Sequence, residues 1–262
     1  MSLHVEVMGQ GPDLVLLHGW GMHGGVWRGV CETLAGRFRL HAIDLPGMGH
    51  SPSCDPYSLP HLARVLASAL PAQAAVCGWS LGGQVAMQLA LEFPDQVSRL
   101  ILVGSTPCFV KTADWPHGVD AEVFSAFARQ VEADYHSSME RFLGLQAFGG
   151  ESSRKLMRAL REQFSARPAP SPEALQQALN VLLQTDLRER LPQLGQPALI
   201  VHGEHDMLAP QAAAHWMAKA LPQACLHLIP GGSHAPFLSH PAAFASCVNT
   251  FLDQPFDNSR AA

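Results

Sequence analysis

The sequence lacks the features that mark secreted, membrane-spanning and nucleic-acid-binding proteins. Its six cysteines form no C-x-x-C pair and no dense framework, which is typical of reduced thiols. No uninterrupted apolar run reaches about 18 residues, and the first residues, MSLHVEVMGQG, show no basic segment followed by an apolar one. Seventeen basic against 22 acidic residues give a formal net charge of -5, so the chain as a whole lacks the positive charge that is typical of a nucleic-acid binder. We therefore expect a cytoplasmic protein without nucleic-acid or membrane partners.

Charged residues are scarce as well, at 15% against an average of about 25%. Hydrophobic residues make up 47% of the chain, so a large core can be buried and disorder is excluded. The 262 residues exceed a typical domain of roughly 100 to 200 residues. These quantities predict one α/β domain with an insertion.

Apolar stretches of strand type alternate with helical ones along most of the chain. Leu3, Val5 and Val7 alternate with polar neighbours, as in a half-buried strand. Further strands are predicted at Leu14 to Leu17, FRLHAIDLPG, AAVCGW, RLILVGS, ALIVHG and CLHLIP, and helices at Leu59 to Leu70, GGQVAMQLALEF, after Pro210 and from Pro241 to Leu252. This alternation predicts a mostly parallel sheet flanked by helices.

The alternation stops between about residues 110 and 190, where helical stretches follow one another and a proline-rich joint, RPAPSP, separates two of them. This predicts a helical cap inserted into the core. The expected organisation is a first core part at 1–109, the cap at 110–190, a second core part at 191–254 and a flexible tail at 255–262.

The segment Gly78-Trp79-Ser80-Leu81-Gly82 has the pattern G-x-S-x-G and lies where a predicted strand gives way to a helix. That context is typical of a nucleophile elbow, in which a sharp turn exposes the serine hydroxyl. A glycine-rich turn with an incidental serine would give the same pattern, so the serine needs catalytic partners further along the chain.

A serine hydroxyl is a weak nucleophile unless a histidine takes its proton and a carboxylate orients that histidine. Asp206 follows the predicted strand ALIVHG, and His234 follows the predicted strand CLHLIP. The chain order Ser, Asp, His is that of α/β hydrolases. Ser80, Asp206 and His234 are therefore the predicted catalytic triad.

Acyl transfer also needs N–H groups directed at the oxyanion, usually from the residue after the nucleophile and from a loop after an earlier strand. The backbone N–H groups of Leu81 and Trp20 fit these positions. The Trp20 indole could instead simply pack under the cap, and that packing is compatible with a role of the Trp20 backbone N–H at the oxyanion.

Two other interpretations use the same segments. Gly19, Gly21 and Gly24 spell G-x-G-x-x-G, with Asp44 about 20 residues further on, which resembles a dinucleotide-binding pattern. It leaves Ser80, Asp206 and His234 unexplained. The group His202, Glu204, His205 and Asp206 lacks the spacing of a zinc protease motif, so no metal and no organic cofactor are expected.

The motifs LVLLHGWG, DLPGMGHS, GWSLGG, HGEHD and GGSHAPFLSHP stand in an order that resembles the α/β-hydrolase superfamily across nearly the whole chain. The segments HGWGMHGGVW, STPCF, Trp115-Pro116, ERFLGLQ and HAPFLSHP are similar to the pimeloyl-[acyl-carrier protein] methyl ester esterase family of biotin synthesis. That resemblance implies a carboxylesterase that removes a methyl group from a carrier-bound chain. We expect the protein to be a monomer.

The resemblance also implies contacts for the cap. Phe142 and Gln146 would border the acyl chain together with Trp20, Ser80, Leu81 and His234. Arg141, Arg154 and Arg158 match basic positions that the family uses for its acidic carrier, whereas Ser137 stands where a further arginine is expected. Between Arg141 and Arg167 there are six basic residues and two acidic ones, which favours an acidic partner, with a solvated helix face as the alternative.

A general short-acyl esterase or a C–C bond hydrolase of the same fold remains an alternative. A non-catalytic receptor that keeps the triad as a pocket wall is another, because fold and motif do not prove turnover.

Overall fold

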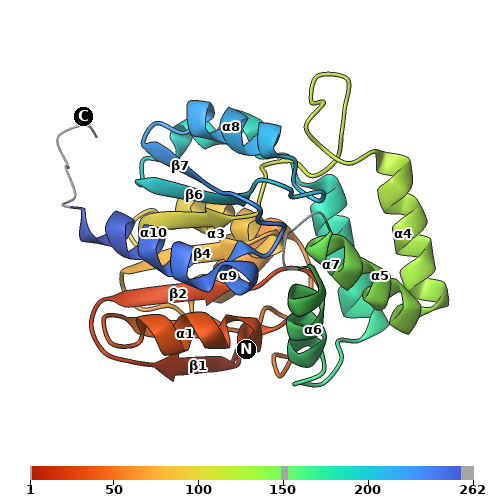
Figure 1. Cartoon of the computed structure of the whole chain (residues 1–262), viewed down its shortest axis with the longest axis horizontal. Helices are drawn as coiled ribbons and strands as arrows, with labels where there is room; N and C mark the ends of the chain where they lie inside the picture. Colours follow the sequence, from red (N-terminus) through yellow and green to blue (C-terminus); the bar gives the residue numbers. More distant parts are fainter. Residues whose placement is uncertain (1, 149–152, 255–262) are drawn as a thin grey trace.

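The computed structural model describes residues 2–148 and 153–254, and seven strands within them form one sheet (Figure 1). Their order across the sheet is β1-β3-β2-β4-β5-β6-β7, and all neighbours are parallel except the antiparallel pair β1 and β3. The strands are β1 (Val5–Met8), β2 (Asp13–Leu17), β3 (Arg39–Ile43), β4 (Ala74–Trp79), β5 (Val97–Val103), β6 (Ala198–Gly203) and β7 (Ala224–Ile229). The predicted α/β fold with a mostly parallel sheet is confirmed.

The first strand departs from its predicted pattern. Leu3 is buried, but Val7 on β1 is 57% exposed although it belongs to the apolar side of the alternation. β1 is an edge strand that pairs with β3 alone, so the sheet covers one of its sides only. The alternating pattern predicted the strand correctly, but it also predicted burial of Val7, which is exposed.

Helices cover both faces of the sheet. Buried side chains of β2, β4, β5 and β6 alternate between two clusters, one with α2, α3 and α8 and the other with α1 and α10. Figure 1 shows α1 and α10 in front of the strands. The bounds are α1 (Arg28–Leu34), α2 (Leu59–Ala67), α3 (Leu81–Glu92), α8 (Gln211–Ala220), α9 (Pro236–Ser239) and α10 (Pro241–Asp253), with short 3-10 turns at Gly24–Trp27 and Arg188–Gln193.

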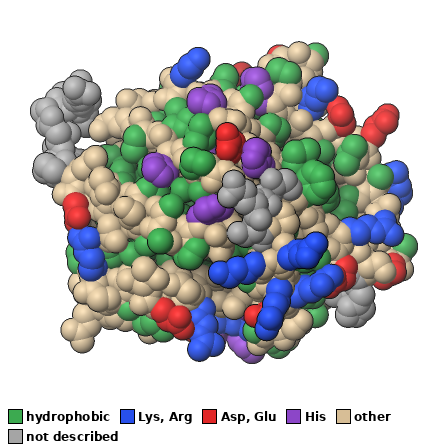
Figure 2. All heavy atoms as spheres, in the orientation of Figure 1, with side chains coloured by type: hydrophobic (Ala, Val, Ile, Leu, Met, Phe, Trp, Pro, Cys, Tyr) green, Lys and Arg blue, Asp and Glu red, His purple; other side chains and the backbone are tan. Residues whose placement is uncertain are grey.

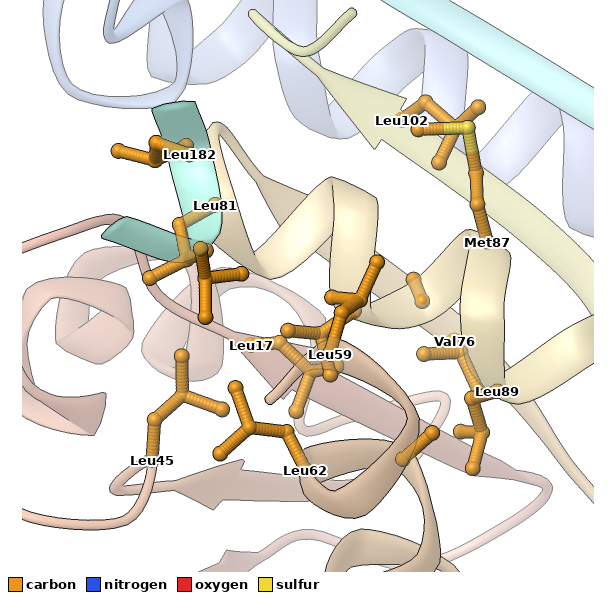
Figure 3. Packing of buried hydrophobic residues seen from close by; sticks show 14 of the residues in the cluster. Leu17, Leu45, Leu59, Leu62, Val76, Leu81, Met87, Leu89, Leu102 and Leu182 are labelled. Carbon is orange, nitrogen blue, oxygen red and sulfur yellow. The ribbon is translucent and has the colours of Figure 1, made fainter. Parts of the chain in front are cut away.

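The first cluster joins the central strands to the cap. Leu17 of β2, Val76 of β4 and Leu81, the first residue of α3, belong to one cluster of buried residues (Figure 3). Leu182 of the cap belongs to the same cluster and lies close to Leu81 in this view. The start of α3 is therefore held by apolar packing from both sides.

The helices α4 (Ala121–Ala133), α5 (Tyr135–Ala147), α6 (Ser153–Phe164) and α7 (Pro172–Gln184) follow β5 and precede β6. They lie together beyond one end of the sheet (Figure 1). The proline-rich joint begins α7, since Ser171 accepts a hydrogen bond from the Ala174 N–H and Pro172 occupies the first helical turn. The predicted tail at 255–262 lies outside the described residues.

One cap residue is tied to the core by charge. Arg167, between α6 and α7, forms ion pairs with the buried Asp44 and with Glu6 of β1, and its own side chain is 7% exposed. Burial would raise the pKa of Asp44, but the His50 and Gly24 N–H groups and the Arg167 guanidinium hold the pKa below its usual value. Arg167 therefore contributes nothing to the exposed positive charge that the sequence counted in the cap.

No helix in residues 2–148 and 153–254 is long and apolar enough to cross a membrane.

Candidate active site

Ser80 occupies the turn between β4 and α3 with φ 55 and ψ -117, the only described residue other than glycine at positive φ. The turn is tight because two backbones almost touch. A Cβ on Gly78 would lie 2.2 Å from the Gly82 carbonyl oxygen, and one on Gly82 would lie 2.4 Å from the Leu17 carbonyl oxygen. The two glycines of G-x-S-x-G are thus required for close approach, and the strained serine is held at the start of a helix.

Asp206 and His234 come together from the ends of neighbouring strands. Asp206 follows β6 and His234 follows β7, and His234 Nδ1 lies 2.9 Å from Asp206 Oδ2 and 3.0 Å from Oδ1. Asp206 Oδ1 also accepts hydrogen bonds from the Leu208 and Ala209 N–H groups, each at 2.9 Å. Both side chains are almost fully buried, so the carboxylate fixes the ring with its Nδ1 proton toward Asp206.

The charge on Asp206 is maintained inside the protein. Burial would raise the pKa of its carboxyl, but the charge of His234, the hydrogen bond from that ring and the Ala209 N–H hold the pKa below its usual value. His202, buried on β6, donates from Nε2 to the Ala209 carbonyl at 2.6 Å, and the same nitrogen lies 3.5 Å from Asp206 Oδ2. Burial lowers the pKa of His202, which leaves a neutral ring beside the carboxylate.

Contacts next to Ser80 link the turn to the histidine. The Trp79 indole N–H donates to the His234 carbonyl at 2.9 Å, and the two rings lie 5.6 Å apart. The Ser105 hydroxyl donates to the Ser80 carbonyl at 2.8 Å. Sequence reasoning did not identify Trp79 and Ser105, because their partners are backbone atoms that no motif shows.

The predicted oxyanion residues border the same turn. Trp20 and Ser80 line one cavity, and Leu81 begins α3, where the first N–H groups have no partner within the helix. His18 holds the loop that carries Trp20: its Nδ1 donates to the Gly19 carbonyl at 2.8 Å, while Nε2 accepts from the Leu45 N–H at 2.9 Å. Burial lowers the pKa of His18 to about 4, in keeping with a neutral ring.

A cavity of about 350 Å³ opens beside Ser80. Its walls are mostly apolar and come from the loops after the strands and from α4, α5 and α7. Trp20 stands edge-on to Phe142, with ring centroids 4.9 Å apart, and its indole N–H donates to the Leu175 carbonyl. The arrangement suits an apolar chain that reaches the serine from the cap.

The two predicted chain-binding residues of α5 lie in different places. Phe142 lines the cavity. Gln146 is fully buried outside the cavity lining, and its backbone carbonyl accepts a hydrogen bond from the His234 N–H at 3.2 Å. Among the described residues no partner is found for the Gln146 side-chain amide. The cap therefore touches the histidine through the backbone of α5.

Neither rival interpretation of these segments gains support. The carboxylate of Asp44 accepts from the Gly24 and His50 N–H groups and pairs with Arg167, so it is not free to bind a ribose. Residues 2–148 and 153–254 contain no group of three or more histidine, cysteine, aspartate or glutamate side chains placed to hold a metal ion.

The predicted docking arginines differ in their partners. Arg141 donates to Gln130 at 3.1 Å and lines the cavity, and Arg158 pairs with Glu162 at 2.7 Å. Arg154 is exposed and has no ion pair within the described part of the chain. Lys and Arg side chains gather over α6 on one face of the molecule (Figure 2). Ser137 is exposed, and its N–H bonds to Asp134.

Known proteins resemble the chain over nearly its whole length. Residues 12–241 match the α/β hydrolase fold family. A pimeloyl-[acyl-carrier protein] methyl ester esterase of Nitrosomonas europaea is 49% identical over 95% of this chain and 98% of its own. An esterase of the same name from Aeromonas hydrophila is 45% identical over 96% of this chain and 100% of its own.

Solved structures show the same fold. An esterase from Exiguobacterium antarcticum superposes with a TM-score of 0.88 at 24% identity, with 96% of each chain covered. An enol-lactonase from Burkholderia xenovorans gives a TM-score of 0.85 at 23% identity, again with 96% of each chain covered. The chain belongs to the α/β hydrolase fold family and, within it, to the family that the two pimeloyl-[acyl-carrier protein] methyl ester esterases represent.

Proposed function

We propose that the protein is a serine carboxylesterase that hydrolyses the methyl ester of pimeloyl-[acyl-carrier protein] methyl ester, a step of biotin synthesis. The observation that carries the proposal is the placement of Ser80 on a strained turn at the floor of an apolar cavity, next to the buried pair of Asp206 and His234. The two close relatives bear the name of this activity.

In this mechanism Ser80 Oγ attacks the ester carbonyl while His234 Nε2 takes the hydroxyl proton. The backbone N–H groups of Trp20 and Leu81 stabilise the oxyanion, and Asp206 stabilises the imidazolium through Nδ1. Collapse of the tetrahedral intermediate breaks the bond to the methoxy group, which leaves as methanol with the proton from His234. Water then attacks the acyl-enzyme with His234 as the base, and the free carboxylate leaves.

The carrier is expected to dock on the exposed basic side chains of α6, where Arg154 has no ion pair among the described residues and Arg158 pairs with Glu162. Acyl-carrier proteins are acidic, and complementary charge raises the encounter rate. The apolar walls around Phe142 then accept the methylene chain.

Mass spectrometry of carrier loaded with the pimeloyl methyl ester tests the proposal. Incubation with the protein should remove the mass of one methylene from the carrier, and the Ser80→Ala variant should leave the carrier unchanged. A carrier-free ester of similar size runs beside it. Equal turnover of both esters would favour a general esterase, and no turnover of either would favour a non-catalytic receptor.

A further inference from the structure

The cavity beside Ser80 has polar side chains at two separate depths. Ser80 is 5% exposed and lies at the floor. Gln130 of α4 and Arg141 of α5 also line the cavity, but both are exposed, which places them at its mouth. Between the two levels the described lining consists of aromatic and aliphatic side chains, and the Trp20 N–H is already taken by the Leu175 carbonyl. A chain whose ester reaches Ser80 therefore leaves the cavity past Gln130 and Arg141.

The two residues at the mouth offer more donors than acceptors. Arg141 Nη1 donates to Gln130 Oε1 at 3.1 Å, which uses one of the two lone pairs of the amide oxygen. The amide NH₂ of Gln130 and the other guanidinium N–H groups remain, and among the described residues neither side chain has a further hydrogen bond or ion pair. Such a pair, with one positive charge, suits an acceptor oxygen.

We propose that Gln130 and Arg141 form a subsite for an acceptor oxygen that lies one apolar chain away from the reacting ester. The protein accordingly hydrolyses carrier-free methyl monoesters of straight-chain dicarboxylic acids, whose far carboxylate binds at the mouth. The inference rests on the proposed function for the chemistry at Ser80, but it assigns a substrate class that needs no carrier. An amide or thioester carbonyl presents the same acceptor chemistry with no charge.

Discrimination at the mouth follows from hydrogen bonding. A hydrocarbon tail that ends beside Gln130 and Arg141 displaces water from both and returns no hydrogen bond. A carboxylate accepts hydrogen bonds from two N–H groups at once, whereas the neutral oxygen of an amide carbonyl is a weaker hydrogen-bond acceptor. Because the site is exposed and screened, we expect a preference of about 3- to 10-fold in kcat/KM for the carboxylate over the hydrocarbon, and a smaller one for the amide.

The test compares three methyl esters on each purified variant: the monomethyl ester of pimelic acid, its N-methylamide, and the methyl ester of an unbranched fatty acid of equal length. Ratios of kcat/KM between esters on one protein cancel any difference in the folded fraction. Gln130→Leu and Arg141→Met should each bring both ratios close to one. Arg129→Met is the matched control, because Arg129 is an exposed arginine of α4 outside the cavity lining, and it should keep the wild-type ratios.

Several results would overturn the subsite. One is the absence of any preference between the three esters in the wild-type protein, and another is the survival of both preferences in Gln130→Leu and Arg141→Met. A carboxylate preference that depends on Arg141 but not on Gln130 would mean long-range attraction without a paired site. Failure of the proposed function looks different: the methyl ester would then stay on the carrier, or the carrier-bound and carrier-free esters would be turned over equally, whatever the ratios among the three carrier-free esters.

Discussion

The predicted catalytic triad and the cap differ in how their polar side chains are held. Asp206 and His234 are buried and tied to each other and to backbone N–H groups. Arg154 and Gln130 of the cap are exposed on helices and have one partner or none within the described residues. The interaction between two charges is stronger in the low dielectric of the protein interior than in water. We therefore expect the chemistry to depend on the core and the choice of substrate to depend on the cap.

Substitutions in the predicted triad should cause the largest loss of activity, and they should leave the selectivity between substrates unchanged. Ser80→Ala and His234→Ala should abolish nearly all esterase activity, and Asp206→Asn should lower kcat by on the order of 10⁴ because the ring loses its orienting acceptor. The losses should be equal for the carrier-bound ester and a small ester. The double variant of Ser80 and His234 should be no worse than either single one, since the two act as a unit.

Steady-state kinetics with both esters measures this, and thermal unfolding of Ser80→Ala serves as the folding control. A sizeable residual activity in Ser80→Ala would place the nucleophile elsewhere. A loss confined to the carrier-bound ester would assign selectivity to the core and contradict the division.

The sequence located the strand ends that carry Ser80, Asp206 and His234 because of how parallel strands end. Ser80, Asp206 and His234 each follow a strand whose apolar run is visible, and the ends of parallel strands meet at one edge of the sheet. Glycines on both sides of Ser80 marked the turn further. The local sequence pattern was enough to locate these three residues because all of them follow strands of the same sheet.

The cap was predicted as helical, but the intramolecular partners of its polar side chains were not. Arg167 was counted among the positive charges of the cap, yet its partner Asp44 lies far away in the sequence and no local signal joins them. The Gln130 bond to Arg141 spans two helices, so its existence depends on how α4 and α5 pack. On a helix every third or fourth residue shares a face, and the face that meets a neighbour cannot be read from one sequence.

The ion pair of Arg167 and Asp44 is the place where core and cap depend on each other. Arg167→Met leaves a buried carboxylate with two N–H donors and no counter-charge, so the free energy of unfolding should fall by about 3 kcal/mol. That corresponds to a melting temperature lower by roughly 10 °C for a chain of this size. Limited proteolysis should show the earliest cleavage in the cap, because the joint before α7 loses its attachment.

Arg28→Met is the control, since Arg28 forms an exposed pair with Glu32 on α1 and should change the free energy by under about 0.5 kcal/mol. Adding Asp44→Asn to Arg167→Met should cost less than the sum of the single changes, because the unpaired charge is removed. Equal melting temperatures for Arg167→Met and Arg28→Met would mean that the cap is held by apolar packing alone.

The smallest effect is expected at the exposed face of α6, and it separates docking from chemistry most sharply. Arg154 and Lys155 have no ion pair in the described residues, whereas Arg158 is partly neutralised by Glu162 and Arg161 by Glu140. The attraction of an acidic carrier to Arg154 and Lys155 should therefore be stronger than its attraction to Arg158 and Arg161. Each exposed contact is worth about 0.2 to 1 kcal/mol, so reversing both to glutamate should lower the ratio of kcat/KM for the carrier-bound ester to that for a small ester by very roughly 2- to 30-fold.

Reversal of Arg158 should lower that ratio less, since its loss frees Glu162 and the starting charge was already compensated. All of these differences should shrink as salt shortens the Debye length from about 10 Å at 0.1 M. A larger effect at Arg158 than at Arg154 would show that the carrier breaks the pair with Glu162 on docking. An unchanged ratio in every reversal would move the carrier to another face and leave α6 as a solvated helix.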